Sequence, residues 1–191
     1  AFVAHKYGDN TAKLLGRLSL NPMHHIDPFG TVVFPLISIV LGAMSGGAGF
    51  IFGWAKPVPI NFSKLKSPKK DLLWIALAGP LSNLAMALIW GLLLKGTLYL
   101  DNYFGVPLSL MAQAGISINV SLLILNLLPI LPLDGGRILF SLLPVKQAQQ
   151  YAQTERYGMW ILIALLLLGG LNYIMQPLYS LLVGGIFTLL R

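Results

Sequence analysis

Residues 72–94 read LLWIALAGPLSNLAMALIWGLLL, a run of 23 residues without a charged side chain. About 20 apolar residues are enough to carry a helix across the hydrocarbon core of a bilayer. This stretch therefore predicts a membrane-spanning helix. The Gly-Pro pair within it predicts a bend, or a place where another segment packs closely against the helix.

The composition of the whole chain agrees with a membrane protein. Of the 191 residues, 56% are hydrophobic and 10% are charged, and the mean hydropathy is +0.76. Soluble domains carry about 25% charged residues, and one of this size could not bury so much apolar surface. The composition therefore excludes a soluble enzyme, a coiled coil and a disordered chain. The lack of cysteine excludes disulfides and thiolate metal sites.

Further apolar segments follow along the chain. They cover residues 31–54, 108–128, 157–171 and 174–190, with a connection at 98–107 and a break after Gly169-Gly170. The expected fold class is an all-α polytopic membrane protein with about four to five membrane helices or re-entrant segments. A short irregular or β-hairpin stretch is expected near the N-terminus, because Pro22 and Pro28 exclude a continuous helix there. Residues 1–191 are expected to form one membrane-embedded domain.

Basic residues predict the orientation in the membrane. The net charge is +7, and one short loop between two apolar runs carries Lys64, Lys66, Lys69 and Lys70. Such a loop is typical of the cytoplasmic side of a multi-pass protein in the cell membrane, and its position argues against nucleic-acid binding. Residues 1–30 are also basic. If both flanks are cytoplasmic, residues 31–54 form a re-entrant hairpin; a single span is the alternative.

The densest chemical signal is the stretch NLLPILPLDGGR at residues 126–137. Pro129 and Pro132 remove backbone donors and prevent a regular helix. Gly135 and Gly136 then allow a close approach of backbone or ligand. Asp134 lies between these pairs, at the end of an apolar span. A carboxylate at membrane depth is costly and so indicates function, whereas a helix-capping or turn residue near Arg137 is the alternative.

Two other stretches combine polar residues with glycine or proline. Within the first apolar run, Gly79 and Pro80 precede Asn83, which would share a helix face with Gly79; a packing kink is the alternative to a functional role. Near the N-terminus, Asn21, His25 and Asp27 belong to the stretch NPMHHIDP. Two histidines and a carboxylate suggest a metal site. Adjacent histidines on an extended strand point to opposite faces, however, which favours a hydrogen-bonded loop.

Together these motifs resemble the site-2 protease family of intramembrane zinc metalloproteases, peptidase family M50. They read NPxxHIDP, GPxxN and NxxPxxPxDGG, and the stretch GWAKPVPIN at residues 53–61 is similar as well. The resemblance covers almost the whole chain. It is greatest to the compact branch of the family that has no PDZ domain.

The resemblance implies a function and a set of site residues. Family members cleave transmembrane helices of substrate proteins within the lipid bilayer, using one zinc ion. Two histidines and a glutamate come from a His-Glu-x-x-His helix, and the aspartate of the Asp-Gly-Gly motif, here Asp134, would be the third protein ligand. Asn126 would contact the substrate backbone or the developing oxyanion. Pro129 and Pro132 would keep the backbone non-helical beside the metal.

The chain departs from the family pattern at one point. It contains no His-Glu-x-x-His: its histidines are His5, His24 and His25, and its one glutamate is Glu155. The first residues read as the end of a helix, so we expect an N-terminally truncated family member, inactive alone. A pseudo-protease that binds or scaffolds transmembrane partners is the alternative. A transporter is a third reading, which the lack of repeated halves disfavours.

Overall fold

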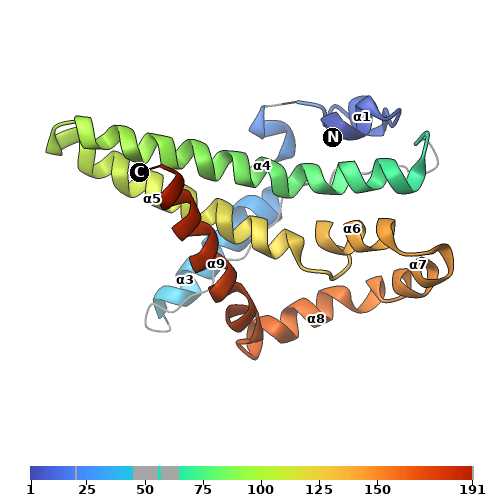
Figure 1. Ribbon diagram of the computed structural model, residues 1–191. Coiled ribbons are helices and arrows are strands. Elements are labelled where there is room, and N and C mark those ends of the chain that lie inside the picture. Colours follow the sequence, from blue (N-terminus) through green and yellow to red (C-terminus); the bar gives the residue numbers. More distant parts are fainter. Residues whose placement is uncertain (20, 45–55, 57–64, 191) are drawn as a thin grey trace. The chain divides into compact units, whose positions relative to one another are not determined.

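The structure is a computed structural model that describes residues 1–19, 21–44, 56 and 65–190. It divides into two compact units, Ala1–Pro68 and Lys69–Arg191. Within the described residues all regular secondary structure is helical (Figure 1), which confirms the all-α fold class. The expectation of one membrane-embedded domain over residues 1–191 stays a prediction.

The first unit begins with short helices. They are α1 (Phe2–Lys6), α2 (Thr11–Leu14), the 3-10 helix η1 (Pro22–His25) and the π-helix η2 (Pro28–Val33). Residues 15–19 form a turn followed by irregular backbone, with no strand among them. Of the two expected forms of this stretch, the irregular one is therefore observed in its described residues, and the β-hairpin is not.

One apolar helix follows in the first unit. It is α3 (Phe34–Met44), which continues directly from η2. The glycine-rich residues 45–49, the stretch 53–61 apart from Lys56, and Lys64 of the lysine-rich loop lie outside the described residues. The choice between a re-entrant hairpin and a single span for residues 31–54 therefore stays a prediction.

The second unit contains the two longest helices, α4 (Pro68–Gly96) and α5 (Asn102–Leu127), joined by the 3-10 helix η4 (Thr97–Tyr99). Helix α4 with η4 covers 32 residues and α5 covers 26, and both are long and apolar enough to cross a membrane. The connection between the two spans was predicted to cover residues 98–107, but it is shorter, because α5 already begins at Asn102. Helix α5 begins at Asn102 because Asp101 accepts a hydrogen bond from the Phe104 amide, a typical helix cap.

The chain then turns back through α6 (Asp134–Leu142) and α7 (Val145–Ala152), and ends with α8 (Glu155–Leu167) and α9 (Gly170–Leu189). Helices α8 and α9 meet at a bend of 80°. Taken together, the two helices are long and apolar enough to form one broken membrane span or a re-entrant loop. The bend lies at Leu168 and Gly169, slightly before the predicted break. Gly169 has a φ of 72°, a conformation that glycine adopts readily, so α9 can begin at Gly170.

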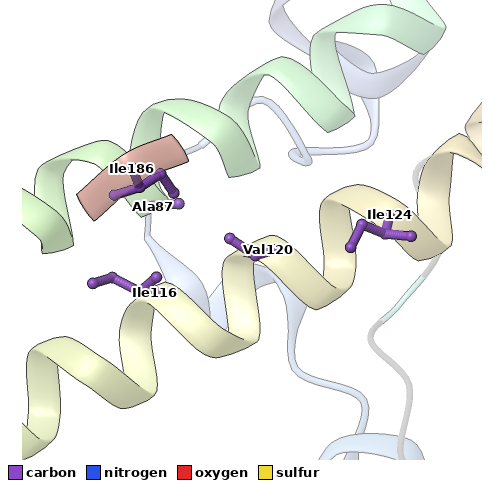
Figure 2. Packing of buried hydrophobic residues seen from close by; sticks show 5 residues of the cluster. All are labelled: Ala87, Ile116, Val120, Ile124 and Ile186. Carbon is purple, nitrogen blue, oxygen red and sulfur yellow. The ribbon is translucent and has the colours of Figure 1, made fainter. Parts of the chain in front are cut away.

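The core of the second unit lies where α4, α5 and α9 meet. Ile116, Val120 and Ile124 are spaced four residues apart and form one stripe along α5. Figure 2 shows Ala87 of α4 and Ile186 of α9 over this stripe. Between α5 and α9, Tyr179 also donates a hydrogen bond to the Ser117 hydroxyl, 2.8 Å away. Packing in this core holds α4 and α5 in place, and these two helices carry Gly79, Asn83 and Asn126 of the candidate site.

Candidate metal-binding site

Asp134 is the first residue of α6, directly after the loop that leaves α5. Its side chain is half-buried, and the N-cap position of α6 is occupied by Leu133 rather than by Asp134. The helix-capping role considered from the sequence is therefore not observed. Arg137 lies close enough to act on the charge of this half-buried carboxylate, as the turn-residue alternative expects.

Gly79 in the middle of α4 faces this carboxylate. A Cβ atom built on Gly79 would overlap Oδ2 of Asp134, so the carboxylate occupies the space where any other residue would have a side chain. The next residue, Pro80, is buried and lacks the amide that would bond to Ala76. The structure thus brings together two of the motifs singled out in the sequence, although 54 residues separate them.

The loop between α5 and α6, residues 128–133, is non-helical, as the two prolines predicted. Its backbone lies close against α6. A Cβ on Gly135 would overlap the Leu127 carbonyl oxygen, and a Cβ on Gly136 would lie 2.6 Å from the carbonyl carbon of Ile130. The close approach that these glycines allow is therefore one between loop backbone and helix. It fixes Asp134 next to a compact turn.

Tyr151 of α7 holds the outer part of the same loop. Its hydroxyl donates a hydrogen bond to the Pro129 carbonyl oxygen over 2.9 Å. Partial burial raises the pKa of the Tyr151 hydroxyl above its usual range, so the group stays protonated and can donate. Pro129 has no amide hydrogen, so its carbonyl is the backbone group through which neighbours can hold it.

Two asparagines predicted for the site lie on the long helices. Asn126 is near the end of α5 and Asn83 is one turn after Gly79 on α4; both side chains are half-buried. Neither makes a hydrogen bond to a described residue. Each amide therefore retains its donors and acceptor for a ligand. Their roles in binding stay predictions.

Asn21, His25 and Asp27 lie in the first unit and take part in local structure. Asn21 accepts a hydrogen bond from the Met23 amide, and His25 bonds to the Ser19 carbonyl oxygen at 3.0 Å. Asp27 accepts from the amides of Phe29 and Gly30 and so caps η2. These contacts favour the hydrogen-bonded loop over a metal site.

The metal-binding capacity of the described residues is limited. Nowhere in the described part of the chain do three His, Cys, Asp or Glu side chains come together as a metal site requires. A catalytic zinc ion has three protein ligands, and the second unit offers Asp134 alone at this position. The residues present thus fit a partial site that needs further donors.

Sequence reasoning missed two contacts of this site. Gly158 of α8 lies so close to the loop that a Cβ would overlap the Leu131 carbonyl oxygen. Tyr151 stands in the polar stretch KQAQQYAQTER at residues 146–156, whose sequence alone indicates only contact with solvent. A lone glycine in an apolar helix can indicate close packing, but nothing in the sequence says which segment packs there.

Comparison with known proteins identifies the family. The family model described as Peptidase family M50 matches residues 104–169, which include Asn126, Asp134 and Gly158. The protein named "Putative zinc metalloprotease YwhC" from Bacillus subtilis is 36% identical over 188 residues, covering 94% of this chain and 78% of that protein. No solved structure matches the chain significantly.

More distant relatives carry a similar name. "Putative zinc metalloprotease Rip2" from Mycolicibacterium smegmatis is 28% identical over 176 residues, and the protein of that name from Mycobacterium tuberculosis H37Rv is 29% identical over 178 residues. Each match covers 90% of this chain but only 62% of the relative. The chain belongs to peptidase family M50, the site-2 protease family of zinc metalloproteases.

Proposed function

We propose that the chain forms the greater part of an intramembrane zinc metalloendopeptidase that cleaves transmembrane helices of other proteins. The observation that carries the proposal is the contact between Asp134 and Gly79, which joins the Asp-Gly-Gly motif to the middle of a membrane-spanning helix. Membership of family M50 supplies the chemistry.

The depth of the carboxylate supports cleavage within the bilayer. Lys69 and Lys70 precede the apolar part of α4 and mark one edge of the membrane. Gly79 follows Lys69 by ten residues, or about 15 Å along a helix. The hydrocarbon core is about 30 Å thick, so Asp134 lies near its middle.

Asp134 would hold the zinc ion as one of its three protein ligands. Bound zinc supplies a water molecule activated for attack on a peptide carbonyl. The two histidines and the general base, which these 191 residues do not provide as a His-Glu-x-x-His motif, would come from another segment of the protein. Within the chain, Gly79 and the loop before α6 keep the Asp134 carboxylate in its orientation.

Asn126 and Asn83 would contact the substrate. Each carries an amide side chain that makes no hydrogen bond to a described residue, and each lies on a helix that contributes to the site. A substrate helix must unwind before its peptide bond can be cut, and its freed backbone groups then need partners in the bilayer. Amide side chains can donate and accept at the same time.

The basic ends of the second unit support one orientation. The Lys69 side chain donates a hydrogen bond to the Leu143 carbonyl oxygen. This contact joins the start of α4 to the end of α6, so the basic residues of both regions lie on the same side. Following the positive-inside rule, we assign this side to the cytoplasm and the protein to the cell membrane.

The experiment uses the protein expressed from its native gene and purified in detergent. Zinc content is measured by mass spectrometry and cleavage with a transmembrane reporter. We expect Asp134→Asn to abolish cleavage and to lower the zinc content. The matched control is Asp101→Asn on α5, because Asp101 is exposed and asparagine also caps helices. Full zinc content in Asp134→Asn would overturn the ligand assignment.

The pseudo-protease alternative predicts a different result. It is favoured by the incomplete metal site among the described residues. In that case the wild-type protein would carry no zinc and cut no reporter, yet would retain a transmembrane partner through purification. The same zinc and cleavage measurements therefore separate the two functions.

A further inference from the structure

The loop of residues 128–133 leads directly into Asp134. At two of its positions no amide hydrogen is present for a neighbouring group to bind. Pro129 and Pro132 have no N–H group, so neighbours must fix these positions through carbonyl oxygens or packing. Within the loop, Ile130 donates to the Leu128 carbonyl and Leu133 donates to the Ile130 carbonyl. Arg137 of α6 donates from its side chain to the Pro132 carbonyl at 3.4 Å and from its amide to the Leu133 carbonyl. The carbonyls of Pro129 and Leu131 therefore remain for partners from elsewhere in the unit.

Helix α8 covers the Leu131 carbonyl. Gly158 is the one fully buried residue of α8, so it is the point at which this otherwise exposed helix meets the rest of the unit most closely. Its Cα lies against the Leu131 oxygen, and a Cβ there would also lie 3.4 Å from Cδ of Pro132. An approach of this kind permits a weak Cα–H···O contact that only glycine allows here. In Figure 1 the loop lies between α6 and α8.

Helix α7 covers the Pro129 carbonyl. The Tyr151 hydroxyl reaches it from 22 residues along the chain, at 2.9 Å. The two carbonyls are therefore contacted by residues from outside the Asp-Gly-Gly motif, one by a hydrogen bond and one by close packing. Gly135 and Gly136 pack against the backbone of Leu127 to Leu131 from within the motif.

We propose that Tyr151 and Gly158 are positioning residues that set the orientation of the Asp134 carboxylate through this loop. We call the pair the carbonyl brace. The inference rests on the proposed function, in which Asp134 binds zinc. It adds a task for α7 and α8, which hold the metal-ligand loop from outside. The role proposed for both brace residues is exerted through the loop and not by binding the metal or the substrate themselves.

The test measures loop mobility with a spin label attached to one introduced cysteine. The 191 residues contain no cysteine, so none of them would be labelled in addition. A cysteine replaces Ile130, which is partly exposed in the middle of the loop, and carries a nitroxide in the purified full-length protein. Any native cysteine elsewhere in that protein is replaced by serine. Electron paramagnetic resonance then reports loop mobility without requiring activity.

The variants are Gly158→Ala and Tyr151→Phe, each with a matched control. Gly185→Ala in α9 is the glycine control, since a Cβ there meets nothing within 4 Å. Tyr173→Phe is the tyrosine control, because Tyr173 is 85% exposed. Tyr151→Phe removes one hydroxyl and retains the ring, so this variant decides the outcome even if Gly158→Ala fails to fold.

We expect both brace variants to increase nitroxide mobility, and both controls to leave the spectrum unchanged. Without the label, zinc affinity should fall about 10- to 100-fold in Gly158→Ala, as is typical of groups that orient a metal ligand, and less in Tyr151→Phe. The kcat for the reporter should fall while KM changes little, because substrate contacts are retained.

Two results would overturn the brace: an unchanged spectrum in Tyr151→Phe, or a mobile loop with unchanged zinc affinity. A wild-type protein without zinc would instead refute the proposed function. The spectra would still show whether Tyr151 and Gly158 order the loop. Failure of the proposed function and failure of the brace are therefore distinguishable.

Discussion

The carboxylate of Asp134 lies directly against Gly79, at the point where α4 has no side chain. Two polypeptide segments thus meet through the smallest residue on one side and an ionisable group on the other. Ser82 donates a hydrogen bond to the Gly79 carbonyl over 2.7 Å, so the backbone of Gly79 is held from within α4. The contact between the Asp134 carboxylate and Gly79 explains why the residue before Pro80 is a glycine, because a side chain there would occupy the position of the carboxylate.

Gly79→Ala should displace the Asp134 carboxylate. The new methyl group would overlap Oδ2, and the carboxylate can yield only by rotating out of its orientation. Alanine is a better helix former than glycine by about 1 kcal/mol, so helix propensity cannot account for a loss. We expect zinc affinity to fall about 10- to 100-fold, as measured by competition with a zinc chelator.

Gly96→Ala provides the control for this prediction. Gly96 ends the same helix, and a Cβ there meets nothing within 4 Å. Its zinc affinity should equal that of the wild type. Equal affinities in Gly79→Ala and wild type would show that the contact with Asp134 has no part in metal binding.

Asn126→Ala should lower kcat about 100- to 1,000-fold, the usual effect of losing a donor to a developing oxyanion. Zinc content should stay at the wild-type level because Asn126 is not proposed as a ligand. Asn119→Ala on the same helix is the control, since its amide already bonds to the Gly115 carbonyl at 2.8 Å. A parallel loss of zinc in Asn126→Ala would contradict a role confined to the substrate.

The sequence predicted the long helices well because their signal is local. Residues 72–94 need only be apolar and long enough, and both conditions are visible in one window. The ends of helices depend on single contacts. The start of α5 was misplaced because the predicted segment began after Pro107, whereas the helix begins at the cap made by Asp101 and continues through Pro107.

The candidate site was predictable in part. Asp134 and Gly79 each stood out as an unusual residue in or next to an apolar segment. That they touch depends on how α4 and α6 pack, which one sequence does not encode in any short window. The role of Gly158 was harder still to predict, because a glycine is required there only by the nearby carbonyl oxygen of Leu131, which belongs to another segment.

Ile116→Ala should destabilise the second unit far more than Ile118→Ala. Ile116 is 2% exposed in the core between the helices, whereas Ile118, on the same helix, is 59% exposed. Truncating a buried isoleucine costs about 2–5 kcal/mol, since a cavity remains. The exposed position should cost much less in the free energy of unfolding, measured by denaturant titration in mixed micelles. Equal losses would contradict the packing of α5 shown in Figure 2.

Asp27→Ala should loosen η2 without any effect on zinc. The Asp27 carboxylate accepts hydrogen bonds from the amides of Phe29 at 3.0 Å and Gly30 at 2.9 Å. Losing a helix cap costs about 1 kcal/mol, so these two amides should exchange with deuterium about five times faster. Asp27→Asn keeps an accepting oxygen and should retain most of the protection.

The zinc content of these variants decides between the two interpretations of the first unit. A capping residue can be replaced by asparagine or alanine with the metal retained, whereas a metal ligand cannot. We therefore expect wild-type zinc content in Asp27→Ala and in His25→Ala, and a reduced content in Asp134→Asn. Loss of zinc from Asp27→Ala with wild-type exchange at Phe29 and Gly30 would instead make Asp27 a ligand, and the missing donors would then have to be sought among the first 30 residues.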